Sequence, residues 1–116
     1  MFTSNMFLMI HCYLGIISYT EVGEGKCASD WGNDKWILTA ESASATDRGI
    51  EGQNLAQCKI KCSSLPDCNY IVYSGSETGR KEYSWCYLWS EETCTPLPHH
   101  YPYKIYKKDK GKTIHR

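Results

Sequence analysis

Cysteine is the residue type with the most reactive chemistry in this chain. Seven cysteines occur, at positions 12, 27, 58, 62, 68, 86 and 94. Their thiolates could act as nucleophiles, bind zinc or pair as disulfides. Cys12 lies in an N-terminal apolar segment that we expect to be removed, which leaves six cysteines. An even number in a short chain that enters an oxidising compartment indicates a disulfide framework.

Histidine is the next candidate for chemistry, as a base or as a zinc ligand. His99 and His100 lie near Cys94, with two further cysteines in the middle of the chain, and such a set could suggest zinc. The even cysteine count argues against it, so we predict no metal and no cofactor. A cysteine or serine nucleophile needs a positioned base, yet the histidines fall in no local motif and the sequence has no G-x-S-x-G or H-E-x-x-H. We predict that the protein is not an enzyme.

The N-terminal segment indicates the compartment. Residues 6–17 are apolar apart from one histidine and one cysteine, and the small residues Ser18 and Thr20 follow. A run of this length is short for a membrane span, which takes about 20 apolar residues, and it fits the core of a signal peptide. We predict a signal peptide over residues 1–20 and a secreted, extracellular protein. An uncleaved anchor and a buried N-terminal strand are the alternatives.

Local patterns predict one helix and several strands to position the cysteines. Asn54 can cap a helix, with Gln57 three residues later as in a capping box. Apolar residues and cysteines then recur at spacings of three and four on one helix face, as far as Leu65, where Pro66 disfavours helical geometry. Aromatic and β-branched stretches predict strands at residues 36–39, 68–74, 83–90 and 101–107. The predicted fold class is a small disulfide-rich α+β domain over residues 21–108, with one α-helix packed on a curled antiparallel β-sheet.

The helix narrows the possible disulfide pairings. Cys58 and Cys62 project in parallel from one face, so a bond between them would be strained and each should reach a different segment. Cys62 lies just before the turn to Cys68, whereas Cys58 can reach Cys86 in a later strand. The two remaining cysteines then close the outside of the domain. The predicted pairs are Cys58–Cys86, Cys62–Cys68 and Cys27–Cys94.

The cysteines of the middle of the chain lie in the run QCKIKCSSLPDCNYIVYS, which is followed by WCYLW and YKIYKK. With these motifs the sequence resembles the PAN/apple domain family. Family members have a helix carrying Cys-x-x-x-Cys, a third cysteine shortly after it and a fourth in a later strand that precedes a leucine, here Leu88. The resemblance covers residues 27–108 and implies the same helix-to-sheet disulfides. For the six-cysteine apple type it also implies a bridge from the first cysteine to the last, although Cys94 follows Cys86 more closely than is usual there.

An aromatic strand face is the first candidate binding surface. If Cys86 points at the helix, alternation along the strand sends four rings to the opposite face. These rings are Tyr83, Trp85, Tyr87 and Trp89. They could stack on sugars or anchor a protein interface. The alternative is that loops or the N-terminal segment cover them as a second small core, because large exposed apolar patches are uncommon on monomers.

A basic C-terminal tail is the second candidate surface. We predict it over residues 109–116, next to Lys107 and Lys108, which we also consider as ligand-binding residues. Such a run can bind sulfated glycans or make contact with a membrane surface. The alternative is a solvated chain end.

The overall charge excludes one class of partner. Basic and acidic residues number 13 each, so the molecule has no strong field that would attract nucleic acid.

The sequence predicts a secreted binding module that recognises an extracellular protein or glycan, as the resemblance to PAN/apple domains also implies. A secreted effector or toxin-like protein that acts on a receptor is the main alternative, and an enzyme is a more remote one.

Overall fold

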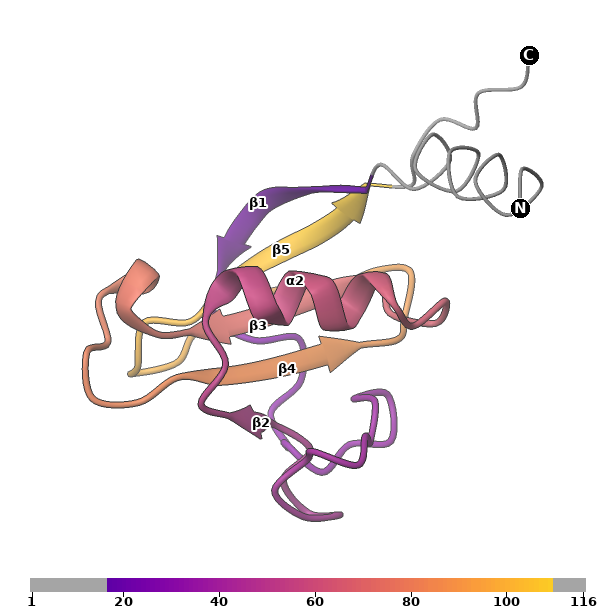
Figure 1. The fold of residues 1–116 in the computed structure, drawn as a ribbon, viewed down its shortest axis with the longest axis horizontal. Helices are drawn as coiled ribbons and strands as arrows, with labels where there is room; N and C mark the ends of the chain where they lie inside the picture. The colour runs from indigo at the N-terminus through magenta and orange to yellow at the C-terminus, as the bar shows by residue number, and fades with distance from the viewer. Residues whose placement is uncertain (1–16, 110–116) are drawn as a thin grey trace, which may run out of the picture.

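The computed structural model describes residues 17–109, which form one α-helix and a five-stranded antiparallel sheet. The strands are β1 (Ser18–Glu24), β2 (Ile50–Glu51), β3 (Tyr70–Ser74), β4 (Trp85–Trp89) and β5 (Lys104–Asp109). Their order across the sheet is β1-β5-β3-β4-β2. Helix α2 (Leu55–Ser63) lies across one face, and a short 3₁₀ helix, η1 (Ser76–Thr78), follows β3 (Figure 1). The predicted fold class, a small disulfide-rich α+β domain, is confirmed.

Helix α2 begins where the sequence predicts and ends two residues earlier. The side-chain oxygen of Asn54 accepts from the backbone N–H of Gln57 at 2.8 Å, and the side-chain oxygen of Gln57 accepts from the N–H of Asn54 at 2.9 Å. This reciprocal capping box satisfies two of the free donors at the helix start. The helix ends at Ser63 because the N–H of Leu65 bonds to the carbonyl three residues before it. That shorter bond tightens the chain ahead of Pro66.

The strands differ from prediction in their limits and in one case in their existence. The predicted strands at 68–74, 83–90 and 101–107 correspond to β3, β4 and β5. The predicted strand at 36–39 is wrong, because the segment makes only an isolated bridge between Trp36 and Trp89. Its tryptophan is instead a core residue of a covering loop. Strands β1 and β2 were not predicted.

Strand β1 includes residues that the sequence places at the end of the signal peptide. Ser18 lies opposite Asp109 of β5, and the hydroxyl of Tyr19 donates to the carbonyl of Lys59 in α2 at 3.0 Å. Residues 1–16 of the predicted signal peptide lie outside the described residues. Within residues 17–109, no helix is long and apolar enough to cross a membrane.

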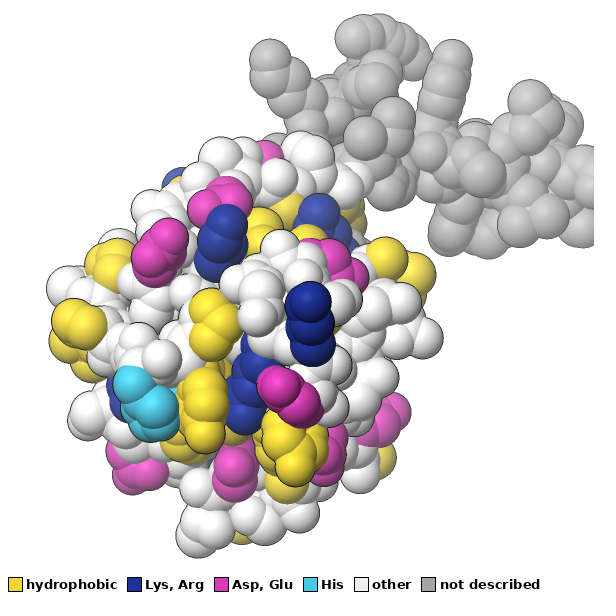
Figure 2. Space-filling model, turned by 90° about the vertical axis from the view of Figure 1, so that its left-hand side faces the viewer, with side chains coloured by type: hydrophobic (Ala, Val, Ile, Leu, Met, Phe, Trp, Pro, Cys, Tyr) yellow, Lys and Arg dark blue, Asp and Glu magenta, His cyan; other side chains and the backbone are white. Residues whose placement is uncertain are grey.

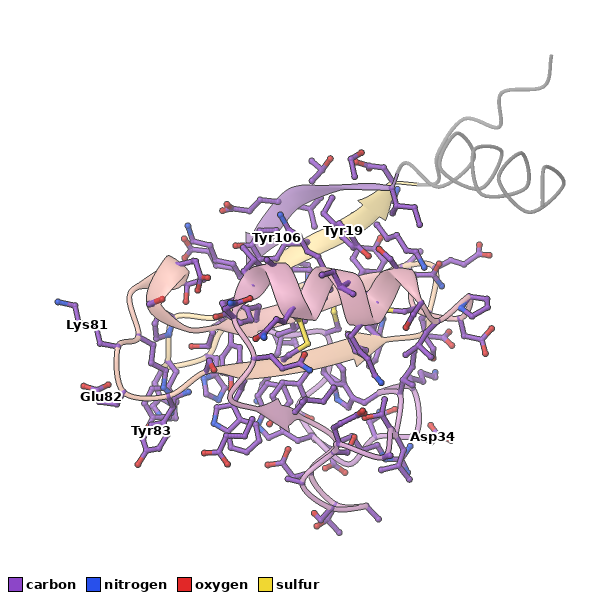
Figure 3. The ribbon with its side chains drawn as sticks, in the orientation of Figure 1. Tyr19, Asp34, Lys81, Glu82, Tyr83 and Tyr106 are labelled. Atoms are coloured by element: carbon purple, nitrogen blue, oxygen red, sulfur yellow. A yellow bond between two sulfur atoms is a disulfide. The ribbon has the colours of Figure 1, made fainter. Side chains whose placement is uncertain are left out.

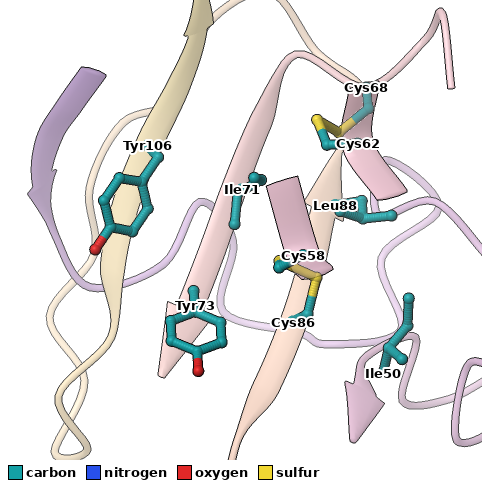
Figure 4. Packing of buried hydrophobic residues seen from close by; sticks show 9 residues of the cluster. All are labelled: Ile50, Cys58, Cys62, Cys68, Ile71, Tyr73, Cys86, Leu88 and Tyr106. Carbon is teal, nitrogen blue, oxygen red and sulfur yellow. A yellow bond between two sulfur atoms is a disulfide. The ribbon is translucent and has the colours of Figure 1, made fainter. Parts of the chain in front are cut away.

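The sheet buries side chains on both faces, which gives two cores. Ile71 and Tyr73 of β3 face α2, whereas Tyr70 and Val72 point to the opposite side, as alternation along a strand requires. The core beneath α2 is completed by cysteines and apolar residues from the helix and the neighbouring strands (Figure 4). The opposite core is largely aromatic and lies beneath residues 25–49.

Three disulfides join these layers, and they are the predicted pairs. Cys58–Cys86 ties α2 to β4, and Cys62–Cys68 ties the last turn of α2 to the segment before β3 (Figure 4). Cys27–Cys94 joins two loops on the other face, and its partners have a sequence separation of 67. Three intramolecular disulfides in so small a domain indicate an extracellular or secreted protein.

Candidate binding site

Most of the predicted aromatic face of β4 lies inside the second core. Tyr87 is 2% exposed and Trp89 is 5% exposed. Trp31 stacks on Tyr87 with ring centroids 4.0 Å apart, and Trp36 meets Trp89 edge-on at 4.6 Å. Both covering tryptophans belong to the long segment between β1 and β2. Tyr87 and Trp89 are therefore not available to a ligand at the surface. They belong to a second core covered by a loop, which was the alternative to a binding face.

The other two aromatic candidates lie nearer the surface. Trp85 is half-buried at the start of β4, and its ring lies 6.1 Å from that of Tyr87. Tyr83 precedes the strand and is 55% exposed. Figure 3 shows Tyr83 with Lys81 and Glu82 at one end of the molecule, pointing away from the sheet. Only Tyr83 of the predicted four therefore offers most of its ring to a partner.

The two predicted lysines have different environments. Lys108 donates to the carbonyls of Cys62 and Leu65 at 3.0 and 3.1 Å. It therefore satisfies carbonyls at the C-terminal end of α2, and its positive charge interacts favourably with the negative end of the helix dipole. Lys107 is exposed on β5, beside an open hollow that also includes Glu92 and Asp109. Residues 110–116 of the predicted basic tail lie outside the described residues.

Two loops meet at one end of the sheet and bring an arginine between two tyrosines. The Arg80 guanidinium carbon lies 3.9 Å from the ring centroid of Tyr101 and 5.4 Å from that of Tyr83. Tyr101 is 45% exposed and Arg80 is half-buried. We call these three residues the Tyr–Arg–Tyr ridge. On this face Figure 2 shows hydrophobic side chains, a cation and a histidine side by side.

The turn after β3 fixes the arginine of the ridge. The backbone N–H of Arg80 donates to the carbonyl of Gly75 at 2.8 Å, which closes the turn around η1. Gly79 ends η1 with φ of 101°, a left-handed conformation that favours glycine. A Cβ at Gly75 would lie only 2.1 Å from the Tyr73 hydroxyl, so the close approach there also requires glycine. The guanidinium then interacts with the hydroxyl of Tyr103.

The second loop fixes Tyr101 through a histidine. The backbone N–H of Tyr101 donates to Nδ1 of His99 at 3.0 Å, and the His99 ring meets Tyr103 edge-on at 5.0 Å. Burial lowers the pKa of His99, and the nearby charge of Lys26 lowers it further. His99 is therefore neutral at physiological pH, which its acceptor role at Nδ1 requires.

Buried tyrosines support the ridge from below. Burial raises the pKa of Tyr103 to about 12, although the positive charge of Arg80 opposes this rise. The hydroxyl of Tyr87 donates to a carboxylate oxygen of Asp47 at 2.7 Å, and burial raises its pKa well above the usual range. Both phenols stay protonated over the physiological range. They link the ridge to the loop that covers the second core.

Two hollows flank the ridge. The larger has a volume of about 550 Å³ and is lined by Tyr101, both histidines and three prolines of the 96–102 segment. The smaller, of about 300 Å³, is lined by Arg80, Tyr83 and polar side chains around the start of α2. The exposed rings and the half-buried cation thus stand between two shallow depressions. This arrangement suits recognition of a partner surface.

The two histidines do not belong to a metal-binding cluster in the described part of the chain. Their rings stack on each other at 4.6 Å. Within residues 17–109, no group of three histidine, cysteine, aspartate or glutamate side chains is placed to hold a metal ion. All six cysteines of this region are joined as disulfides.

The fold and the ridge define a small, disulfide-rich α+β domain with a polar and aromatic surface at one end of its sheet. Comparison with protein-family models, with curated protein sequences and with solved structures finds no significant match.

Sequence reasoning identified Tyr83 but missed the other two members of the ridge. Arg80 and Tyr101 are 21 positions apart and belong to different loops, so no local spacing connects them. A partial signal is present in the two glycines at positions 75 and 79, which indicate a tight turn. Such a turn could have marked Arg80 as a positioned residue.

Proposed function

We propose that this protein is a secreted binding module that recognises a partner protein through the Tyr–Arg–Tyr ridge. The observation that carries the proposal is the exposure of Tyr83 and Tyr101 on either side of a held guanidinium. Tyrosine and arginine are enriched among the residues that dominate binding energy at protein interfaces. Their long side chains are already positioned here, so little conformational freedom is lost on binding.

The disulfide framework supports the same proposal. A scaffold closed by three cross-links keeps its loops in place outside the cell without a large core. The sequence resemblance to PAN/apple domains, which mediate contacts of extracellular proteins with proteins or carbohydrates, agrees with this role. We propose that the chain is a PAN/apple-like domain.

Glycan recognition is a second candidate, favoured by the smaller hollow. The capping box engages the side-chain oxygens of Asn54 and Gln57 and leaves their amide NH₂ groups as possible donors. The carboxylates of Glu51 and Glu82 line the same hollow as possible acceptors, next to the ring of Tyr83. Polar groups around an aromatic ring can hold a sugar by hydrogen bonds and stacking.

Binding of the oxidised chain to a glycan array and to an array of extracellular proteins tests the proposal. A double variant, Tyr83→Ala with Tyr101→Ala, should lose most of the binding, because the exposed rings contribute contact area and not core packing. Ile60→Ala is the matched control, since Ile60 is 69% exposed on α2 and lies outside both hollows. Binding that the double variant retains in full would overturn the proposal.

A further inference from the structure

In the part of the chain that the structure describes, the Arg80 guanidinium is held by aromatic rings and not by a carboxylate. Among the described residues, the ion pairs are Lys61 with Glu41 and Lys104 with Glu21. Arg80 forms no ion pair within residues 17–109, although Glu51 and Glu82 line the same hollow. The nearby Glu77 is engaged elsewhere, because its two oxygens accept from the Tyr73 hydroxyl and from the backbone N–H of Leu55.

The guanidinium is also restrained before any partner arrives. Its stack on Tyr101 and its contact with Tyr83 limit its rotation. A guanidinium carries five N–H donors in a planar fork that matches the two oxygens of a carboxylate. Such bidentate, charge-assisted bonds are stronger than neutral hydrogen bonds. A held arginine without a carboxylate is therefore suited to receive one from outside.

The geometry points to an acidic peptide segment of the partner protein as the ligand of the ridge, with a glutamate or aspartate carboxylate on Arg80. This inference rests on the proposed function and names its ligand chemistry. An extended peptide directs successive side chains to opposite sides. A peptide that crosses the ridge can therefore place its acidic residue on Arg80 and the residues two positions before and after it toward the hollows on either side.

The hollows beside the ridge carry charges of both signs. Lys81 lines the smaller hollow beside Arg80, whereas Lys104, which lines the larger one, is paired with Glu21. The Lys26 ammonium lies 5.1 Å from the ring centroid of Trp31, and its charge acts on His99. Three carboxylates, those of Glu24, Glu51 and Glu82, also line the hollows. They would disfavour an acidic residue there and favour one at the ridge itself.

Two pools of labelled heptapeptides test the inference. Both have random flanking residues, with glutamate at the centre of one pool and glutamine at the centre of the other. The oxidised full chain should bind the glutamate pool about tenfold more tightly, which corresponds to the charge-assisted part of one hydrogen-bonded contact. Arg80→Gln should abolish this preference, and Arg80→Lys should remove most of it because the fork is lost. Lys35→Gln, which removes an exposed cation outside both hollows, should retain the preference.

Equal binding of the two pools, or a preference that persists in Arg80→Gln, would overturn the inference. An unchanged thermal midpoint of Arg80→Gln shows that the variant is folded. Should neither pool bind while a protein or glycan binds in a way that needs Tyr83 and Tyr101, the acidic-peptide inference is wrong and the binding role stands. If every ligand binds independently of Tyr83, Tyr101 and Arg80, the acidic-peptide inference and the proposed binding role of the ridge are both wrong.

Discussion

Tyr83 and Tyr87 lie four positions apart and have opposite environments. The Tyr87 hydroxyl is bound to Asp47 inside the second core, whereas Tyr83 is 55% exposed. Tyr87→Phe should lower the free energy of unfolding by about 1–2 kcal/mol, because it removes a buried hydrogen bond to a carboxylate. Tyr83→Phe should leave it unchanged. Urea titration of the two variants checks this, and equal stability losses would contradict the assignment of the two rings.

His99 should make stability depend on pH. Burial and the charges of Lys26, His100 and Arg80 keep its pKa below the ordinary value of about 6.5. As pH falls below that value, the unfolded chain takes up a proton before the folded one does, so the free energy of unfolding decreases until pH passes the folded pKa. The contribution of neutral His99 to the free energy of unfolding is therefore fully present above about pH 6.5.

The matched variant for this prediction is His99→Asn. Its amide oxygen can accept from the N–H of Tyr101 as Nδ1 does, without titrating. Urea titrations between about pH 7.5 and pH 5 should show a smaller loss of stability in the variant than in the natural chain. This range stays above the ordinary carboxyl pKa of about 4.3. An identical slope in both proteins would show that His99 is not the responsible group.

At the scale of elements, Lys108 holds the C-terminal end of α2. Lys108→Met keeps the apolar stem and removes the ammonium that binds two carbonyls. We expect a loss of about 1 kcal/mol, the usual contribution of such a bond at a half-buried position. Lys107→Met, an exposed neighbour on the same strand, should cost nothing measurable. Thermal melts compare the two, and equal midpoints would argue against this role of Lys108.

Elements fixed by local chemistry could be predicted from the sequence, and elements fixed by distant contacts could not. The start of α2 depends on Asn54 and Gln57, three positions apart, and both were identified. Strand β1 pairs Ser18 with Asp109, across most of the domain, so nothing near Ser18 indicates its partner. The segment at 36–39 has strand-forming residues, but Trp36 packs on Trp89 instead of extending the sheet.

The candidate site shows the same limit. Its exposed tyrosine at position 83 was among the predicted residues, but the prediction rested on alternation along β4, which in fact places Tyr87 and Trp89 in the core. The true neighbours of Tyr83 come from two loops that meet only in the folded chain. A sequence can indicate which rings alternate on a strand, whereas the loop that covers them is known only once the chain is folded.

For the whole molecule, the bridge from Cys27 to Cys94 should make the largest single contribution to the cross-link stabilisation. It closes the longest loop of the three, with a separation of 67 residues, and on the chain-entropy model it contributes about 4 kcal/mol. Replacing both cysteines by alanine should lower the free energy of unfolding by a similar amount. It should also weaken the near-ultraviolet circular dichroism, because the bridge anchors the segment that covers Trp89. Guanidinium titration and the spectrum check both effects.

The disulfide framework is the foundation of the fold, of the extracellular assignment and of the proposed binding surface. Peptide mapping of the non-reduced protein from a secreting cell tests it most directly. Two proteases separate the cysteines that are close in sequence. Trypsin cuts between Cys58 and Cys62, at Lys59 and Lys61. Glu-C cuts between Cys86 and Cys94, at Glu91 and Glu92, and in phosphate buffer it also cuts between Cys62 and Cys68, at Asp67. We expect three bridged products, which join Cys27 to Cys94, Cys58 to Cys86 and Cys62 to Cys68. Free thiols at these positions, or a different set of pairs, would contradict it.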